Sequence, residues 1–346
     1  MQRRKFVQQA ALLTVMAGAC GTTPTQEPPP SAKLFRPRRL RRGDLIGMAT
    51  PGSYIPDSAL EKAVKNAESL GFRVKLAKNI RAKRGYNAGT DAERLEDLHA
   101  LFADREVAGV WCARGGYGCT RILPKLDYRL IRNNPKAIIG YSDVTALLLA
   151  ITQQTGLVTF HGPVAASEMT DFARTQFMAT LMEGSSELLI QIPDVLKNTS
   201  KPDQTALTIQ SGVAKGVLAG GNLSILTAMA GTLYAPDFTD RIVFMEDVEE
   251  RPYRVDRMLT QLRQACNLEK AAGIALGVFI DCQPEKDVPS LSLMETLQDQ
   301  LAGLGIPVVY GMPLGHLSNQ AVYPVGVQAS LNADDMTLTL LEAGVE

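Results

Sequence analysis

Short apolar runs alternate with amphipathic stretches between residues 45 and 160, a pattern typical of β-α units around a mainly parallel sheet. Strands are predicted at 45–49, 72–76, 107–112, 137–140 and 157–160. Helices are predicted at 58–70, 90–102, 120–126 and 143–155. Two of them begin with a capping box, Ser58 with Glu61 and Thr90 with Glu93. Residues 43–163 are therefore predicted to form an open α/β domain.

The pattern weakens over residues 164–205, which we interpret as a crossover or linker with one helix near 172–182. Residues 206–346 are predicted to form a second, smaller α/β domain, because isolated apolar strands and alternating strands occur together there. The strand signals lie at 214–218, 241–245, 275–280, 308–310, 322–331 and 336–341. Helices are predicted at 223–230, 253–266 and 293–301.

The amino terminus has the parts of an export signal. Arg3, Arg4 and Lys5 precede an apolar run over 10–19, which is too short to span a membrane. The arginine pair indicates a twin-arginine signal in residues 1–20, and the sequence before Cys20 is similar to a lipobox, which predicts lipidation of Cys20. Simple cleavage after Ala19 is the alternative. Residues 21–42 are rich in proline and basic side chains, and predict a tether for an exported, membrane-anchored periplasmic protein.

The composition excludes a function that depends on a large net charge of the whole chain. The chain has 36 basic and 36 acidic side chains, which argues against a nucleic-acid partner. Besides Cys20 there are Cys112, Cys119, Cys266 and Cys282, and their spacing matches neither a metal site nor a disulfide scaffold. We interpret them as core thiols, leaving open whether Cys112 and Cys119 are joined.

Ser142 is the candidate nucleophile. It lies in Gly140-Tyr-Ser-Asp143, between an apolar strand and an apolar helix, where a serine is held out beside the N–H groups of the helix start. Val144 replaces the second glycine of the usual elbow motif. Ser142 or Asp143 as a plain helix N-cap is the alternative.

A serine nucleophile needs a base and a group that orients it. Of the three histidines, His99 lies within a predicted helix, His161 ends a strand, and His316 lies in a loop punctuated by glycine and proline. A loop of this kind is typical of a positioned base. Glu246, at the end of an apolar strand, is the candidate acid or an ordinary strand end.

A glycine-rich segment, Arg114-Gly115-Gly116-Tyr117-Gly118, follows another predicted strand. Its glycines allow close approach to a substrate and can direct N–H groups at an oxyanion or a carboxylate, although a structural turn explains them equally. The nucleotide-binding patterns, paired metal ligands and Ser-x-x-Lys are all absent from the sequence.

Taken together, these segments resemble the LD-carboxypeptidase family in one order over roughly residues 43–332. The matching pieces are Gly89-Thr-Asp91 with Glu93-Arg94, Arg114–Gly118, Gly140–Asp143, His161-Gly-Pro163, Gly220-Gly-Asn-Leu223, Glu246-Asp247 with Pro252-Tyr-Arg254 and Asp256-Arg257, and Gly315-His316. The resemblance implies a flavodoxin-like amino-terminal domain, a smaller carboxy-terminal domain and a homodimer.

The same resemblance implies roles for individual residues. Ser142 would be the nucleophile, His316 the general base and Glu246 its orienter, with no metal or organic cofactor. The N–H groups of the Gly115-Gly116 turn and of Asp143 would form the oxyanion hole. Our own addition is Arg114, which can grip a substrate carboxylate through two hydrogen bonds.

The function implied is hydrolysis of the bond between an L-diamino acid and D-alanine in murein tetrapeptides. One alternative is a related serine peptidase that cleaves peptide-nucleotide antibiotics, as microcin-C immunity peptidases do, or other amides. A second alternative is a murein-peptide-binding lipoprotein without catalysis.

Overall fold

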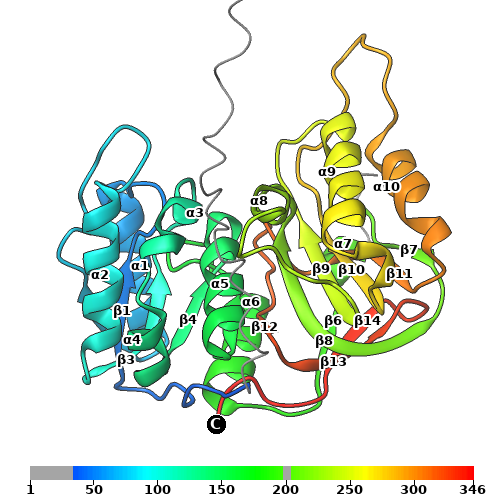
Figure 1. Cartoon of the computed structure of the whole chain (residues 1–346). Coiled ribbons are helices and arrows are strands. Elements are labelled where there is room, and N and C mark those ends of the chain that lie inside the picture. The colour runs from blue at the N-terminus through cyan, green and yellow to red at the C-terminus, as the bar shows by residue number, and fades with distance from the viewer. Residues whose placement is uncertain (1–33, 198–203) are drawn as a thin grey trace, which may run out of the picture. The chain divides into compact units, whose positions relative to one another are not determined.

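A computed structural model describes residues 34–197 and 204–346 (Figure 1). The predicted export signal, Cys20 and most of the proline-rich tether lie outside the described residues. Among the described residues, no helix has the length and apolar character needed to cross a membrane.

The first sheet has six strands in the order β12-β5-β4-β3-β1-β2. Its strands are β1 (Leu45–Ala49), β2 (Arg73–Leu76), β3 (Val107–Cys112), β4 (Ala137–Gly140), β5 (Thr159–His161) and β12 (Tyr323–Val325). Strands β1 to β5 are parallel and have the flavodoxin-like order 2-1-3-4-5, which confirms the predicted fold class. In such a sheet the strand order reverses between β1 and β3, and ligands bind beyond the carboxyl ends of these strands.

The connections between these strands contain five α-helices: α1 (Asp57–Ser69), α2 (Asp91–Ala103), α3 (Cys119–Ile122), α4 (Tyr128–Asn133) and α5 (Thr145–Thr155). Short 3-10 turns occur at Leu123–Lys125 and Ser142–Val144. Strands β3 and β4 are buried along their whole length, which explains why they read as continuous apolar runs.

The two predicted capping boxes have different outcomes. Thr90 caps α2 as predicted, because its side chain accepts from the N–H of Glu93 while the Glu93 carboxylate accepts from the N–H of Thr90. The box at Ser58 is wrong. Helix α1 begins one residue earlier, with Pro56 at the N-cap and no side-chain cap, so Ser58 already lies inside the first turn.

The second sheet has eight strands in the order β6-β14-β13-β8-β9-β10-β11-β7, and parallel and antiparallel pairs are mixed. Its strands are β6 (Leu188–Gln191), β7 (Leu207–Gln210), β8 (Val213–Asn222), β9 (Arg241–Glu246), β10 (Gly273–Gly277), β11 (Val308–Met312), β13 (Gln328–Asn332) and β14 (Thr337–Leu340). The remaining α-helices are α6 (Asp171–Phe177), α7 (Asp194–Lys197), α8 (Leu223–Met229), α9 (Pro252–Ala265) and α10 (Leu293–Leu301). A π-helical segment, Met178–Glu183, follows α6, and 3-10 turns occur at Leu268–Lys270 and Ala302–Leu304.

The structure differs from the sequence prediction in three segments. The predicted strand over 322–331 is two strands in different sheets, because Gly326 has φ 98° and turns the chain between β12 and β13. The crossover over 164–205 contributes β6, which pairs with β14. Residues 34–42 are packed rather than extended as a tether: Leu40 is buried, and Arg36 bonds to Glu342 and to the carbonyl of Ala343.

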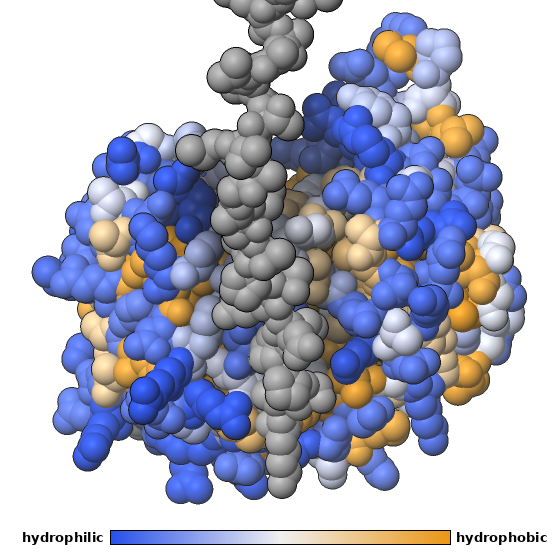
Figure 2. Space-filling model, viewed as in Figure 1, coloured by the Kyte–Doolittle hydropathy of each residue, from blue (hydrophilic) through white to orange (hydrophobic). Residues whose placement is uncertain are grey.

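Aromatic rings join the two sheets at the level of the candidate site. Phe244 of β9 lies with its ring centroid 5.2 Å from that of His161 and 5.3 Å from that of Tyr323, which occupy β5 and β12 of the first sheet. All three side chains are buried. Hydrophilic residues cover most of the coloured face visible in Figure 2. Nearly all buried apolar side chains of the described residues form one core cluster.

Candidate active site

Ser142 lies on a sharp turn between β4 and α5. Its φ of 60° places a non-glycine residue in the left-handed region, a strained conformation that is typical of a nucleophile elbow. Gly140 is needed for the turn, because a Cβ there would lie 2.8 Å from Val144 Cγ1. The N-cap alternative is wrong: neither the 3-10 turn nor α5 has a side-chain cap, and the Asp143 carboxylate instead accepts from the N–H of Cys119 at 2.9 Å.

The glycine-rich loop after β3 passes directly against Ser142. A Cβ on Gly115 would lie 3.2 Å from Ser142 Cβ and 3.5 Å from the backbone nitrogen of Asp143. Only a residue without a side chain leaves this approach free. The Gly115-Gly116 peptide and the N–H of Asp143 thus lie beside the serine, where a developing oxyanion would need donors.

Glu246 and His316 form a hydrogen-bonded pair, with 2.7 Å between Glu246 Oε2 and His316 Nδ1. Glu246 ends β9 and has no solvent exposure. Gly315 has φ 98°, and a Cβ there would lie 2.5 Å from Glu246 Oε2, so glycine allows the loop to close over the carboxylate. Burial alone would lower the pKa of His316, but the charge of Glu246 and its hydrogen bond raise the pKa above its ordinary value.

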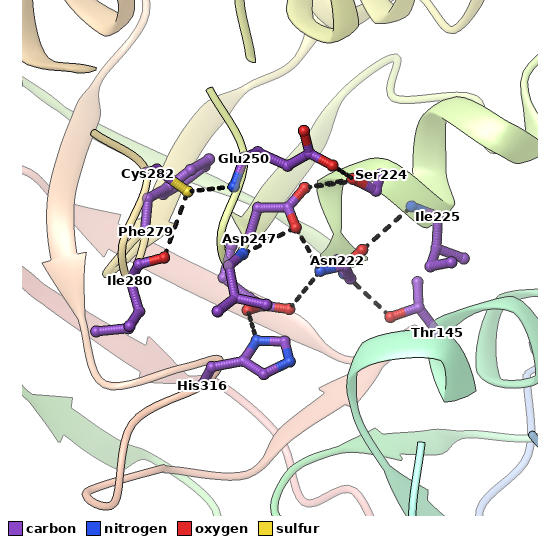
Figure 3. A network of polar contacts seen from close by, with 12 residues as sticks. Thr145, Asn222, Ser224, Ile225, Asp247, Glu250, Phe279, Ile280, Cys282 and His316 are labelled. Atoms are coloured by element: carbon purple, nitrogen blue, oxygen red, sulfur yellow. Dashed lines mark hydrogen bonds and ion pairs between the residues drawn. The ribbon is translucent and has the colours of Figure 1, made fainter. Parts of the chain in front are cut away.

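Asn222 and Asp247 form a buried network behind this pair (Figure 3). Asn222 Nδ2 donates to Glu246 Oε1 at 3.2 Å and to Asp247 Oδ1 at 3.1 Å. Asp247 Oδ2 accepts from the N–H and the hydroxyl of Ser224. Burial, with the nearby charge of Glu246, raises the pKa of Asp247 to about 6. The network thus holds Oε1 of Glu246, while His316 is bonded to Oε2.

The serine turn and the histidine pair meet through Tyr141. Its ring lies edge-on to the ring of His316, with 4.9 Å between centroids, and Tyr141 directly precedes Ser142. The N–H of Asn222 also donates to Thr145 Oγ1 at 3.0 Å, which links the network to the start of α5. Within the described residues, no hydrogen bond joins the Ser142 hydroxyl to His316.

The other two histidines, His99 and His161, do not contact Glu246 through a hydrogen bond in the described part of the chain. His99 Nε2 accepts from the N–H of Asp127 and belongs to a contact between α2 and the start of α4. His161 lies beside Tyr141, with 6.2 Å between ring centroids, and burial lowers its pKa to about 4. A neutral, buried imidazole packed against aromatic rings is a core residue of the junction between the sheets.

The structure gives the position of Arg114 and the state of the cysteines. Arg114 is exposed on the glycine-rich loop, and its Nη1 donates to the carbonyl of Tyr54 at 2.8 Å. Cys112 and Cys119 are separate buried thiols, as are Cys266 and Cys282. Burial raises the pKa of Cys112 to about 12, so it is an unreactive core residue.

A strained serine beside backbone donors, next to a buried carboxylate–histidine pair, is an arrangement typical of serine hydrolases. Comparison with known proteins gives the family. Residues 46–162 match the model of the LD-carboxypeptidase N-terminal domain, and residues 215–331 match that of the C-terminal domain.

Curated relatives align along most of their length. The chain is 40% identical over 311 residues to a probable murein peptide carboxypeptidase of Bacillus subtilis, covering 90% of this chain and 95% of that protein. It is 35% identical over 297 residues to the murein tetrapeptide carboxypeptidase of Pseudomonas aeruginosa, covering 84% and 93%.

Solved structures agree with this relationship. The structure of MccF in complex with glutamyl sulfamoyl guanosine is similar with a TM-score of 0.81 at 25% identity, covering 90% of this chain and 99% of that one. Muramoyltetrapeptide carboxypeptidase from Oxalobacter formigenes is similar with a TM-score of 0.73 at 30% identity, covering 86% and 97%. The chain belongs to the LD-carboxypeptidase family and is a serine-type peptidase.

Proposed function

We propose that this protein is an LD-carboxypeptidase that removes the terminal D-alanine from murein tetrapeptides through a Ser142–His316–Glu246 triad. The observation that carries the proposal is the 2.7 Å pair of His316 and buried Glu246 beside the strained turn of Ser142. The names of the relatives in Bacillus subtilis and Pseudomonas aeruginosa support the substrate.

In the proposed reaction, Ser142 Oγ attacks the carbonyl carbon between the L-centre of the diamino acid and D-alanine. His316 takes the serine proton through Nε2, since Nδ1 is held by Glu246. The oxyanion accepts hydrogen bonds from N–H groups of the Gly115-Gly116 turn and of Asp143. One such donor contributes roughly a hundredfold to a thousandfold in rate.

Collapse of the tetrahedral intermediate breaks the amide bond, and His316 returns the proton to the leaving amine of D-alanine. Water, deprotonated by His316, then hydrolyses the ester on Ser142 and regenerates the hydroxyl. Glu246 stays ionised throughout and stabilises the imidazolium.

The direct test is D-alanine release from L-Ala-γ-D-Glu-meso-diaminopimelate-D-Ala by the purified mature protein, followed by mass spectrometry. The matched control is the same peptide ending in L-alanine. We expect release of D-alanine and at least about tenfold slower cleavage of the control, because the family acts at an L–D bond. A folded protein that releases neither residue, or both at equal rates, contradicts the proposal.

A second candidate substrate is an acidic aminoacyl or peptidyl nucleotide. The similarity to MccF bound to glutamyl sulfamoyl guanosine favours it. Glutamyl sulfamoyl guanosine therefore belongs in the same assay. Its cleavage without cleavage of the tetrapeptide would replace the murein assignment by this one.

We also propose that the protein is exported and held at a membrane by lipidated Cys20. The basic head, the short apolar run and the small residues before Cys20 support this. We expect the chain made in its own host to begin at an acylated Cys20 and to sediment with membranes, whereas Cys20→Ala does not. Mass spectrometry of the amino terminus checks this, and an intact residue 1 in the cytoplasmic fraction contradicts it.

A further inference from the structure

Three loop segments form a rim of tyrosines and exposed cations beside Ser142. We call this surface the tyrosine rim, and define it as Tyr54, Lys83, Tyr86, Arg114 and Tyr117. It lies beyond the carboxyl ends of β1 and β3, where the strand order of the first sheet reverses. None of the residues in the rim belongs to the proposed triad.

Backbone hydrogen bonds fix the rim against the nucleophile loop. The N–H of Ser53 donates to the carbonyl of Gly115 at 3.0 Å, and the N–H of Ala88 donates to the carbonyl of Gly52 at 2.9 Å. Arg84 and Asn87 exchange two backbone hydrogen bonds, which form a tight turn with Gly85 and Tyr86 at its tip. The segments around residues 53, 86 and 116 therefore form one bonded unit.

Two of the three tyrosines in the rim are exposed. Tyr86 and Tyr117 are 61% and 65% exposed, and their rings meet edge to face with 5.4 Å between centroids. Two tyrosines that are ordered against each other but open to solvent offer an apolar face together with a hydroxyl. Such a pair suits a ring-shaped ligand with both C–H and hydroxyl groups, as a sugar has.

The rim is also positively charged. Lys83 Nζ lies 4.1 Å from the centroid of the Tyr54 ring, and the Arg114 guanidinium carbon lies 5.8 Å from it. Lys83 and Arg114 are exposed, and neither forms an ion pair with another residue in the described part of the chain. Two cations without an ion-pair partner favour an acidic ligand.

The dimensions fit a stem peptide that carries a sugar. Three extended residues between the cleaved bond and the sugar span about 10 Å. Tyr117 lies two residues beyond Gly115, which is at most about 7 Å along the chain, and its side chain extends this reach. The γ-linked D-glutamate and the diaminopimelate would each present a free carboxylate on the way.

We infer that the tyrosine rim is a subsite for the sugar-linked, acidic end of the substrate, with the sugar on Tyr86 and Tyr117 and the stem carboxylates at Lys83 and Arg114. This inference rests on the proposed function. It makes tetrapeptides that still carry N-acetylmuramic acid the preferred substrates over free tetrapeptides.

The test compares kcat and KM for N-acetylmuramyl tetrapeptide and for the free tetrapeptide. We expect wild type to favour the sugar-linked form about tenfold in kcat/KM, through KM. Tyr86→Ala and Tyr117→Ala should each remove most of that preference, while Tyr117→Phe, which retains the ring, keeps it. Tyr253→Ala is the matched control, since Tyr253 is 59% exposed and lies beneath the guanidinium of Arg257.

The outcomes separate the inference from the proposed function. Equal kcat/KM for the two substrates in wild type, or a preference that survives both alanine variants, overturns the subsite while the carboxypeptidase assignment stands. Failure of wild type on both substrates contradicts the assignment itself. If Tyr86→Ala and Tyr117→Ala change the oligomeric state in size-exclusion chromatography and leave the preference intact, the rim is a contact with a second copy, and the subsite is overturned.

Discussion

Ser142→Ala is expected to lower the rate of D-alanine release at least about ten-thousandfold, because the proposed acyl-enzyme cannot form without Oγ. The alanine retains Cβ and takes the same left-handed backbone, so the turn is strained to the same degree as with serine. The melting temperature should therefore stay within a few degrees of wild type. Single-turnover mass spectrometry measures the rate, and calorimetry measures the melting temperature.

Ser186→Ala is the matched control for this variant. Ser186 is exposed, and the same loss of a hydroxyl there should change the rate less than about twofold. Wild type should in addition show a mass increase of the bound tripeptide acyl group on Ser142 when the reaction is quenched early. A Ser142→Ala protein that retains more than about one per cent of the rate would place the nucleophile elsewhere.

Local sequence was sufficient to predict the sharp turn at Ser142 and the start of α2. Both depend on residues close in the chain: Gly140 and Val144 shape the serine turn, and Glu93 completes the cap of Thr90. The local pattern at Ser58 was wrong, because Pro56 is the N-cap and the helix begins at Asp57, one residue before the predicted box. A local motif is therefore reliable only where no neighbouring residue competes for the same position.

The part of the site that depends on strand register could not be predicted. Asn222 is the N-cap of α8, because its side chain accepts from the N–H of Ile225. Its bridge to Glu246 and Asp247 exists because β8 and β9 are parallel and place Asn222 opposite Glu246. Sequence spacing alone does not determine which residues of two strands are paired. The same reason explains why β12 was not assigned to the first sheet.

The contact between Tyr86 and Tyr117 in the tyrosine rim could not be predicted from the sequence for a different reason. Tyr86 and Tyr117 lie 31 positions apart, and periodicity gives no sign that their rings touch. The glycines that allow the contact were visible in the sequence, but their partners were not: a Cβ on Gly118 would lie 2.6 Å from Asn87 Oδ1, one residue after Tyr86. A glycine in a loop thus indicates that another group comes close to the backbone, but the sequence does not show which group it is.

Glu246→Gln is expected to lower kcat about a thousandfold to ten-thousandfold, since the amide no longer fixes the tautomer of His316 or stabilises the imidazolium. It should also move the pH profile. In wild type, the pKa of His316 is raised by Glu246, so kcat/KM should rise with pH through a pKa above the ordinary value of histidine as the base loses its proton. Without the carboxylate charge, burial lowers that pKa, and the acid limb should shift to lower pH.

Kinetics between pH 4 and 9 check both effects, with Glu61→Gln as the control. Glu61 is exposed on α1, and the same change there should leave both kcat and the acid limb in place. A purely structural role of Glu246 would lower the amount of folded enzyme without moving the limb, so circular dichroism accompanies the profile. A folded Glu246→Gln protein with kcat within tenfold of wild type and an unmoved acid limb would contradict the role of Glu246 as the orienting carboxylate.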